Sequence, residues 1–304
     1  MHCAVATVVC LGAAVIDRVY EVDAIPSTPQ KVQARDYRER CGGIAATAAV
    51  AIARLGHAAV FWGRLGDDAG AACLLAELAR HGVGTGAVRQ SPGGKTPSAA
   101  VIVDAQGERM LAVFPGSGLA DDPDWLPLGD LADADALLVD TRWPRGALHA
   151  LRAARSRGLP SILDADLGEP QVLAALAEQA GHAIFSAQGL ARLTGLGDHE
   201  AGLRAAQART TGLVGVTLGA EGVCWLEQGE LRRQPAFRIT ARDTTGAGDT
   251  FHGAYALAIA QGKPIAPAMR YAAAAAAIKV RRGEGWDGMP EPSMVEQLLE
   301  SEKT

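Results

Sequence analysis

Short apolar runs alternate with longer stretches of helical periodicity along most of the chain. Apolar runs predict strands at residues 4–10, 59–62, 136–139, 161–163, 183–185 and 213–217. Apolar residues at helical spacing predict helices at 44–55, 70–81, 145–157, 171–179 and 200–208. Strands separated by helices are typical of right-handed βαβ units. The pattern therefore predicts an α/β fold in which a mainly parallel sheet has helices on both faces.

Two regions break this rhythm and read as alternating strands. They comprise residues 15–20 with 31–38, and residues 99–104 with 109–114. The second pair is joined by Ala105-Gln106-Gly107-Glu108, which has the composition of a hairpin turn. A sheet that is apolar on one face can cover the main domain as a lid. We expect a single domain spanning 1–304, with lid strands from about 14–38 and 98–115.

Composition narrows the class of protein. At 304 residues the chain is long enough to bury one large core. Its formal net charge of -5 gives no basic surface for nucleic acid or anionic membranes, and no apolar stretch is long enough to span a membrane. The 5 cysteines are scattered without a CxxC pair, so neither a disulfide framework nor a zinc site is indicated. We expect a cytoplasmic protein that binds small molecules.

The most distinctive segment is Asp243-Thr244-Thr245-Gly246-Ala247-Gly248-Asp249-Thr250-Phe251, followed at once by an apolar run. It places two glycines where a loop becomes a helix. The first turn of a helix has unpaired N–H groups and the positive end of the macrodipole, and glycines let an anion approach them closely. An acid at this place repels that anion. Asp249 is therefore either a first-turn residue favoured by the dipole or a catalytic group.

Three other segments have candidate chemistry. Thr217, Gly219 and Gly222 follow an apolar strand, as in a phosphate-facing loop or an ordinary strand-to-strand turn. Gly42-Gly43 opens the helix predicted at 44–55. Asp17 comes just past the first strand, where a carboxylate can hold the hydroxyls of a ligand.

With these motifs in place, the chain resembles the ribokinase-like (PfkB) family of carbohydrate kinases over nearly its whole length. The C-terminal motif ends in Asp249-Thr250-Phe251, and the N-terminal one runs from Gly42-Gly43 to Leu55-Gly56 and on through 63–68. The resemblance implies a three-layer α/β/α domain with a small β-sheet lid over a sugar. It also implies phosphoryl transfer from ATP, accompanied by Mg²⁺.

The resemblance carries residue roles onto the matched positions. It implies that Asp249 is the base and that Gly246, Ala247 and Gly248 form the anion hole. Sugar contacts fall on Asp17, Gly42 and Gly43, and ATP contacts on Thr217, Gly219 and Gly222, with Asp243 nearby. The chemistry agrees, because phosphoryl transfer needs mainly positioning, electrostatic stabilisation and a group that takes the proton of the attacking hydroxyl.

Two departures from the family pattern bear on the substrate. A family Asn that helps to hold the sugar is replaced by Thr47, and the Asn-x-x-Glu element that organises magnesium is Ser186-Ala187-Gln188-Gly189 here. The protein ligands of magnesium are therefore not predicted. Both departures occur in the branch that phosphorylates 6-deoxy-6-sulfofructose, which this chain resembles at 43–50, 140–143, 185–195 and 234–237.

In that branch a lysine and an arginine hold the sulfonate, and the matching positions are Lys31 and Arg142. A guanidinium binds an oxyanion through paired hydrogen bonds, and an ammonium adds a point charge. A third contact in the branch, an Asn, falls at Val113. The alternative is that Lys31 is a solvated lid residue and Arg142 a structural ion pair at a strand end.

The sequence therefore predicts an ATP-dependent kinase that phosphorylates a primary hydroxyl of a sugar, the 1-hydroxyl of a ketohexose with an anionic group at carbon 6. One alternative is a fructokinase, ribokinase, ketodeoxygluconate kinase or nucleoside kinase, and another is a non-catalytic sugar- or nucleotide-binding regulator. The resemblance is also compatible with a monovalent cation near 276–285. An exposed lid sheet is compatible with a homodimer formed through the lid.

Overall fold

The computed structural model describes residues 5–302, and within them the large sheet has nine strands. Their spatial order is β13-β12-β11-β10-β9-β8-β1-β4-β5. Neighbours from β11 to β5 are parallel, and β12 and β13 add an antiparallel edge. The bounds are β1 (Thr7–Gly12), β4 (Ala58–Gly66), β5 (Gly84–Ser91), β8 (Ala136–Asp140), β9 (Ser161–Ala165), β10 (His182–Ser186), β11 (Leu213–Thr217), β12 (Val223–Glu227) and β13 (Glu230–Gln234).

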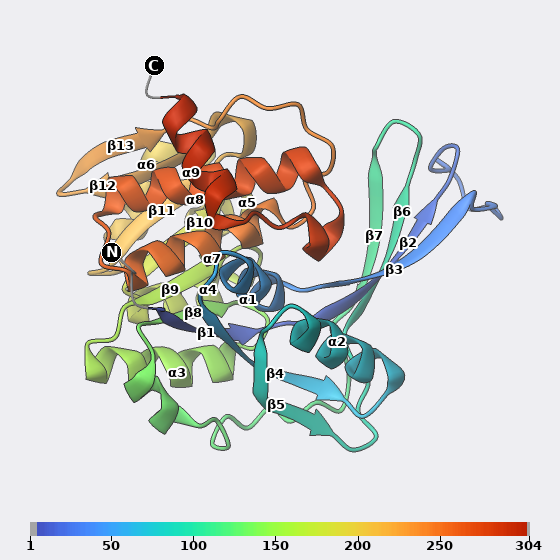
Figure 1. The fold of residues 1–304 in the computed structure, drawn as a ribbon, viewed down its shortest axis with the longest axis horizontal. Coiled ribbons are helices and arrows are strands. Elements are labelled where there is room, and N and C mark those ends of the chain that lie inside the picture. Colours follow the sequence, from blue (N-terminus) through green and yellow to red (C-terminus); the bar gives the residue numbers. More distant parts are fainter. Residues whose placement is uncertain (1–4, 303–304) are drawn as a thin grey trace.

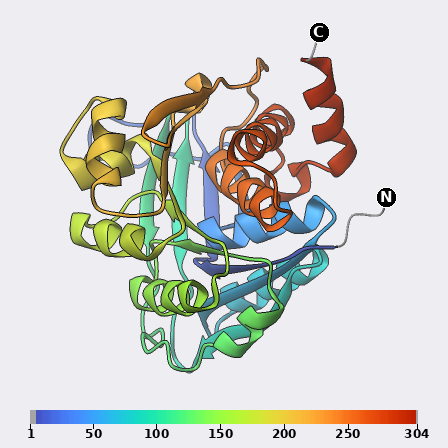
Figure 2. The same cartoon turned by 90° about the vertical axis from the view of Figure 1, so that its left-hand side faces the viewer.

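Helices cover both faces of this sheet, which confirms the expected three-layer α/β/α architecture (Figures 1 and 2). One layer packs α1 (Ile44–Arg54), α2 (Ala69–Arg80), α7 (Ala247–Ala260), α8 (Ile265–Arg282) and α9 (Pro292–Ser301). The other packs α3 (Pro144–Arg157), α4 (Pro170–Gln179), α5 (Ala187–Thr194) and α6 (His199–Gln207). Along β1, Val8 and Cys10 belong to the first core and Val9 and Leu11 to the second, as the two-residue period of a strand requires.

The lid is a separate sheet of four strands in the described part of the chain, in the order β3-β2-β6-β7. It projects from the large sheet beyond β4 and α2 (Figure 1). Its hairpin closes as predicted, with the Asp104 N–H donating to the Glu108 carbonyl over 3.1 Å and Gly107 at a φ of 85°. The strands are β2 (Val15–Glu21), β3 (Asp36–Gly42), β6 (Ser98–Val103) and β7 (Arg109–Phe114).

One lid strand was predicted in the wrong place. The structure begins β3 at Asp36 rather than at residue 31 and continues it to Gly42. The neighbouring strand β2 ends at Glu21, which pairs with Asp36, so in the described chain residues 31–35 have no strand beside them to pair with. Lys31 consequently lies outside the strands. Ala4, with which the first predicted strand begins, lies outside the described residues.

The sequence pattern also missed strands at both edges of the large sheet. β5 and β13 are mostly exposed or half-buried and lack an apolar run. The alanine run at 272–277 lies within α8, where these small side chains are mostly buried. Among the described residues, no helix is long and apolar enough to cross a membrane.

Candidate active site

The anion loop, residues 243–249, ends on the first turn of α7. Gly246 is the N-cap at a φ of 75°, and its carbonyl accepts from the Thr250 N–H over 2.9 Å. This left-handed backbone favours glycine. A Cβ at Gly246 would lie 3.3 Å from Thr47 Cγ2 and 4.0 Å from Asp249 Oδ2. The loop therefore packs against α1, and the Asp249 carboxylate lies close to Gly246.

A cavity of about 520 Å³ adjoins the anion loop. Its lining joins the β11–β12 turn, the segment before the loop, and α7 and α8. Thr217, Gly219 and Gly222 line it together with Gly248, as the ATP assignment requires, and Phe237 and Val280 add apolar surface. The turn contains a short 3-10 helix, η2 (Gly219–Glu221), so the segment is both a strand-to-strand turn and part of the cavity wall.

Asp17, Gly42 and Gly43 come together at the junction of the lid and α1. A Cβ on Gly42 would lie 2.7 Å from Asp17 Oδ2. Gly43 has a φ of 99°, and a Cβ there would lie 2.5 Å from the Ala13 carbonyl oxygen, so only glycine fits. Burial raises the pKa of Asp17 to about 6, although Arg40 lowers it. The three residues assigned to the sugar thus form one cluster.

Thr47 connects this cluster to the anion loop. It is buried in α1, beside Gly246. Its hydroxyl oxygen accepts from Trp286 Nε1 over 3.0 Å, which anchors the 3-10 helix η3 (Gly285–Gly288). The hydroxyl hydrogen is still able to donate to a ligand.

Three carboxylates that the sequence reasoning did not assign lie near Asp249. Burial raises the pKa of Asp249 well above its ordinary value, and Asp164, Asp166 and Asp140 raise it further, while His252 lowers it. Each of the three acids stands at or just past the carboxyl end of β8 or β9. That is where ligands bind in open parallel sheets, so acids at predicted strand ends were the available signal.

Asp140 joins three segments around the site. Its side chain is fully buried and accepts backbone N–H bonds from Ala13 at 2.7 Å, Arg142 at 2.8 Å and Ala45 at 3.2 Å. Burial raises the pKa of Asp140 to about 6, against the effect of these hydrogen bonds. Asp140 therefore fixes the start of α1 relative to the end of β8.

Asp243 does not line the cavity. Its carboxylate accepts from Arg40 of β3 at 3.1 Å and from Arg109 of β7 at 2.9 Å. Burial alone would raise the pKa of Asp243, but hydrogen bonds from Thr245 and Arg109 lower it well below its ordinary value. The carboxylate assigned near ATP thus ties two lid strands to the anion loop.

The residues assigned to the sulfonate are spread over the lid and the main domain. Val113 pairs with Ala99, and Ala99 with Asp17, so all three share one cross-strand row of the lid. Lys31 is exposed in the connection between β2 and β3. Arg142 follows β8, is about half exposed and pairs with Asp166 at 3.3 Å.

The residues that replace the family's magnesium element serve the backbone here. The Ser186 hydroxyl caps α5 by accepting the Gly189 N–H over 2.9 Å. Within residues 5–302, no group of three or more His, Cys, Asp or Glu side chains is placed to hold a metal ion.

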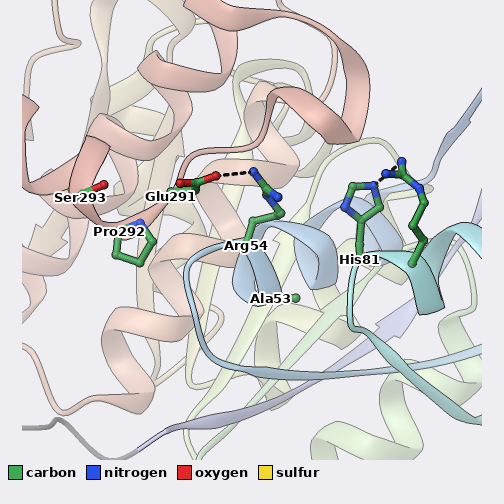
Figure 3. Close-up of a pocket in the computed structure, with 7 residues that line it drawn as sticks. Ala53, Arg54, His81, Glu291, Pro292 and Ser293 are labelled. Atoms are coloured by element: carbon green, nitrogen blue, oxygen red, sulfur yellow. Dashed lines mark hydrogen bonds and ion pairs between the residues drawn. The ribbon is translucent and has the colours of Figure 1, made fainter.

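A cavity of about 630 Å³ lies apart from the anion loop, where the ends of α1 and α2 meet the start of α9 (Figure 3). Its charged groups are engaged with one another: Arg54 pairs with Glu291 at 2.8 Å, and Arg80 donates to His81 at 2.9 Å. The three sugar-assigned residues and Asp249 are absent from its lining. We assign it no role in the reaction.

A parallel sheet, an anion loop with a buried acid, an adjoining cavity and a covering lid define a phosphotransferase with the ribokinase-like fold. The chain belongs to the pfkB family of carbohydrate kinases, whose family model matches residues 5–292. It is a carbohydrate kinase.

Individual relatives agree with this. The ribokinase of Bacillus subtilis is 28% identical over 95% of this chain and 98% of its own length, and fructokinase-1 of Zea mays is 28% identical over 96% and 97%. A solved protein of Agrobacterium tumefaciens is 34% identical, with a TM-score of 0.93 over 99% of this chain and 100% of its own. The Arabidopsis thaliana ribokinase solved with ribose and ATP is 28% identical, with a TM-score of 0.85 over 97% and 99%.

Proposed function

We propose that this protein transfers the γ-phosphoryl group of ATP to a primary hydroxyl of a sugar. The observation that carries the proposal is the position of Asp249, in the glycine-flanked first turn of α7 and next to Gly248, which lines the 520 Å³ cavity. ATP occupies the cavity lined by Thr217, Gly219 and Gly222. Amides of Gly246 to Gly248 stabilise charge on the transferred group, and Asp249 takes the proton of the hydroxyl.

For the acceptor we propose the 1-hydroxyl of a ketohexose with an anionic group at carbon 6, such as 6-deoxy-6-sulfofructose. Asp17, Gly42, Gly43 and Thr47 hold the sugar hydroxyls, and Arg142 together with Lys31 of the lid holds the anion. The support is the exposure of Arg142, whose backbone N–H donates to the buried Asp140, and the exposure of Lys31 in the connection between β2 and β3.

A neutral acceptor is the second candidate, and a specific contact favours it. Arg142 is already paired with Asp166, which offsets its charge, as in the structural reading of this arginine. Ribokinases and a fructokinase are among the relatives of the chain. A plain fructokinase, ribokinase, ketodeoxygluconate kinase or nucleoside kinase therefore fits the same fold and the same base.

A phosphorylation screen separates these candidates. Fructose, ribose, fructose 6-phosphate, ketodeoxygluconate and 6-deoxy-6-sulfofructose are compared by kcat/KM in a coupled assay. Sugar-stimulated ADP formation is expected on at least one of them, and its complete absence would favour a non-catalytic regulator. Arg142→Ala is expected to lower kcat/KM for the sulfonated sugar at least tenfold relative to kcat/KM for fructose. Arg145→Ala is the matched control, because Arg145 is exposed nearby and pairs with Asp121 instead.

We further propose that Mg²⁺ arrives bound to the phosphates of ATP, since this ion keeps waters and phosphate oxygens as ligands. A monovalent cation near 276–285 is less favoured, because Lys279 places a buried ammonium there, donating to the Gly283 carbonyl at 3.3 Å. Turnover rates measured in potassium and in tetramethylammonium salts test this. Equal rates are expected if the Lys279 ammonium takes the place of the cation, whereas a requirement for potassium would support a monovalent-cation site.

A homodimer through the lid is the last element of the proposal. Met110, Leu111, Val113 and Phe114 of β7 are 45%, 55%, 65% and 38% exposed, so both faces of this edge strand present apolar side chains. One face covers the sugar and a second copy of the chain covers the rest. Sedimentation of wild type and Met110→Glu tests the assembly, with dissociation expected for the variant.

A further inference from the structure

His252 and Asp164 form a buried pair that the reaction described above does not use. His252 lies on α7, three residues after Asp249 and therefore on the same side of the helix. Asp164 lies on β9. The two residues are 2% and 3% exposed, and His252 Nδ1 lies 2.9 Å from Asp164 Oδ2. Burying two charges costs desolvation free energy, so a buried ionic pair next to the candidate active site needs a functional or structural explanation.

The surroundings of His252 favour its doubly protonated form. Its Nδ1 faces both the Asp164 carboxylate and the Gly248 carbonyl, the latter at 2.8 Å. Its Nε2 faces the Ile184 carbonyl at 3.3 Å. All three partners can accept a hydrogen bond, and a ring that donates from both nitrogens is an imidazolium. Burial alone would lower the pKa of His252, but Asp164 and the carbonyls raise it to about 9.

Asp249 needs a positive charge nearby. A general base has to be ionised at the working pH, and burial disfavours the ionised form of Asp249. Negative neighbours on other elements disfavour it further, and positive ones oppose them. The negative neighbours are Asp164, Asp166 and Asp140, and the positive ones are His252 on α7 and Lys279 on α8.

We propose that the His252 imidazolium, held by Asp164, is the positioning group of this active site: it fixes the Gly248 carbonyl of the anion loop and keeps Asp249 ionised. His252 acts through Asp249 and Gly248 and does not itself touch the reacting atoms. Asp164 has two opposing effects, since it secures the imidazolium and adds a negative charge near the base. The inference rests on the proposed assignment of Asp249 as the base.

The pH dependence of kcat tests this role. His252→Gln keeps an amide that can donate to a carbonyl but removes the charge, so the acid limb of kcat is expected to move upward by at least one pH unit. In Asp164→Asn/His252→Gln both charges are gone, and the limb is expected to return to within about half a unit of wild type. An unchanged acid limb in His252→Gln, with kcat reduced equally at every pH, would show a packing role and overturn the proposal.

The matched control is His182→Gln. His182 is a partly buried histidine on β10, with Nδ1 2.8 Å from the Tyr255 hydroxyl. Burial lowers the pKa of His182 to about 4, so this ring is neutral at working pH and its replacement removes no charge. Its acid limb of kcat is expected to match that of wild type. A shift equal to that of His252→Gln would point to general loosening and count against the proposal.

A measurement on the wild-type protein guards against variants that do not fold. In ¹⁵N-histidine-labelled protein, one ring is expected to keep both nitrogens protonated until the pH reaches about 9. Neutral rings throughout at pH 8 would overturn the proposal. The outcome is independent of the base assignment: if Asp249→Asn kept its turnover, the proposed base would fail while the imidazolium signal remained.

Discussion

Asp243 and Asp249 lie at the two ends of the same anion loop, but their surroundings shift their pKa values in opposite directions. Asp243 meets two lid arginines, and its pKa lies well below the ordinary value. Asp249 is buried near three other carboxylates, and its pKa lies well above that value. Environments that shift the pKa values of two carboxyl groups in opposite directions suit these groups to different roles. The first is suited to a permanent ionic contact with the lid, and the second to accepting a proton.

The largest expected effect comes from removing Asp249, the proposed proton acceptor, at one end of the loop. Asp249→Asn keeps the shape of the side chain, so the protein is expected to fold with an unfolding temperature near that of wild type. Its kcat is expected to fall by about 10³, within the usual range for general-base assistance. Steady-state kinetics with the best sugar measure this. Asp133→Asn, at an exposed acid far along the chain, is the control, and near-normal turnover of Asp249→Asn would remove the base assignment.

A smaller effect is expected from acidic pH, which acts on Asp17 of the proposed sugar site but not on the contact between Asp243 and the lid. The Asp17 carboxylate, with its pKa near 6, loses its charge as the pH falls through this value, so kcat/KM for the sugar is expected to drop about tenfold between pH 7 and pH 5. Burial disfavours the charged form of Asp17, so protonation does not weaken the fold. Asp243, by contrast, stays ionised over this range.

Asp17→Asn is the variant that checks this pH dependence. It is expected to lose the acid fall of kcat/KM that belongs to the sugar site, while the acid limb of kcat remains. If the wild-type and Asp17→Asn profiles of kcat/KM were superimposable after scaling, another group would govern the acid fall.

The smallest of the three effects is expected at the lid end of the loop. Asp243→Asn removes the charge that Arg40 and Arg109 share; both arginines are about one third exposed, so we expect a loss of about 1 kcal/mol, or about fivefold in kcat/KM. The loss should appear mainly in KM, because the base is untouched, and wild-type KM should rise with salt. A loss in kcat comparable to that of Asp249→Asn would erase the distinction between the two ends.

The sequence allowed the local features of the site to be predicted. Two glycine motifs, the one around Asp249 and Gly42-Gly43, lie where a loop enters a helix. Such a junction is formed by consecutive residues, so it can be recognised in the sequence. The lid hairpin at Gly107 was predictable for the same reason. Neighbours separated by long stretches of chain were not: Asp140 reaches Ala13 across 127 residues, and Asp243 reaches Arg40 across 203. Those contacts depend on strand order, which one sequence pattern does not give.

Polar edges were the other limit. β5 and β13 lie at the margins of the large sheet, where few side chains are buried, so they lack the apolar run that marked the central strands. At residue 31 the opposite error occurred: the alternation suggested a strand, but the partner strand β2 ends at Glu21, opposite Asp36. His252 follows the motif directly, yet its role appears only when Asp164 of β9 is placed beside it.

β3 ends at Gly42 and α1 begins at Ile44, so only Gly43 separates this lid strand from the helix. The same helix, one turn further on, bears Thr47 against Gly246. The lid and the anion loop are thus both connected to α1, the lid through Gly43 and the loop through Thr47, next to the two glycines that we propose contact the sugar. A ligand that fits the lid poorly would leave the loop misaligned even when it is bound. The selectivity of this protein is therefore expected to depend on how well a bound sugar aligns the lid with the anion loop. Turnover, more than binding, should then discriminate between sugars.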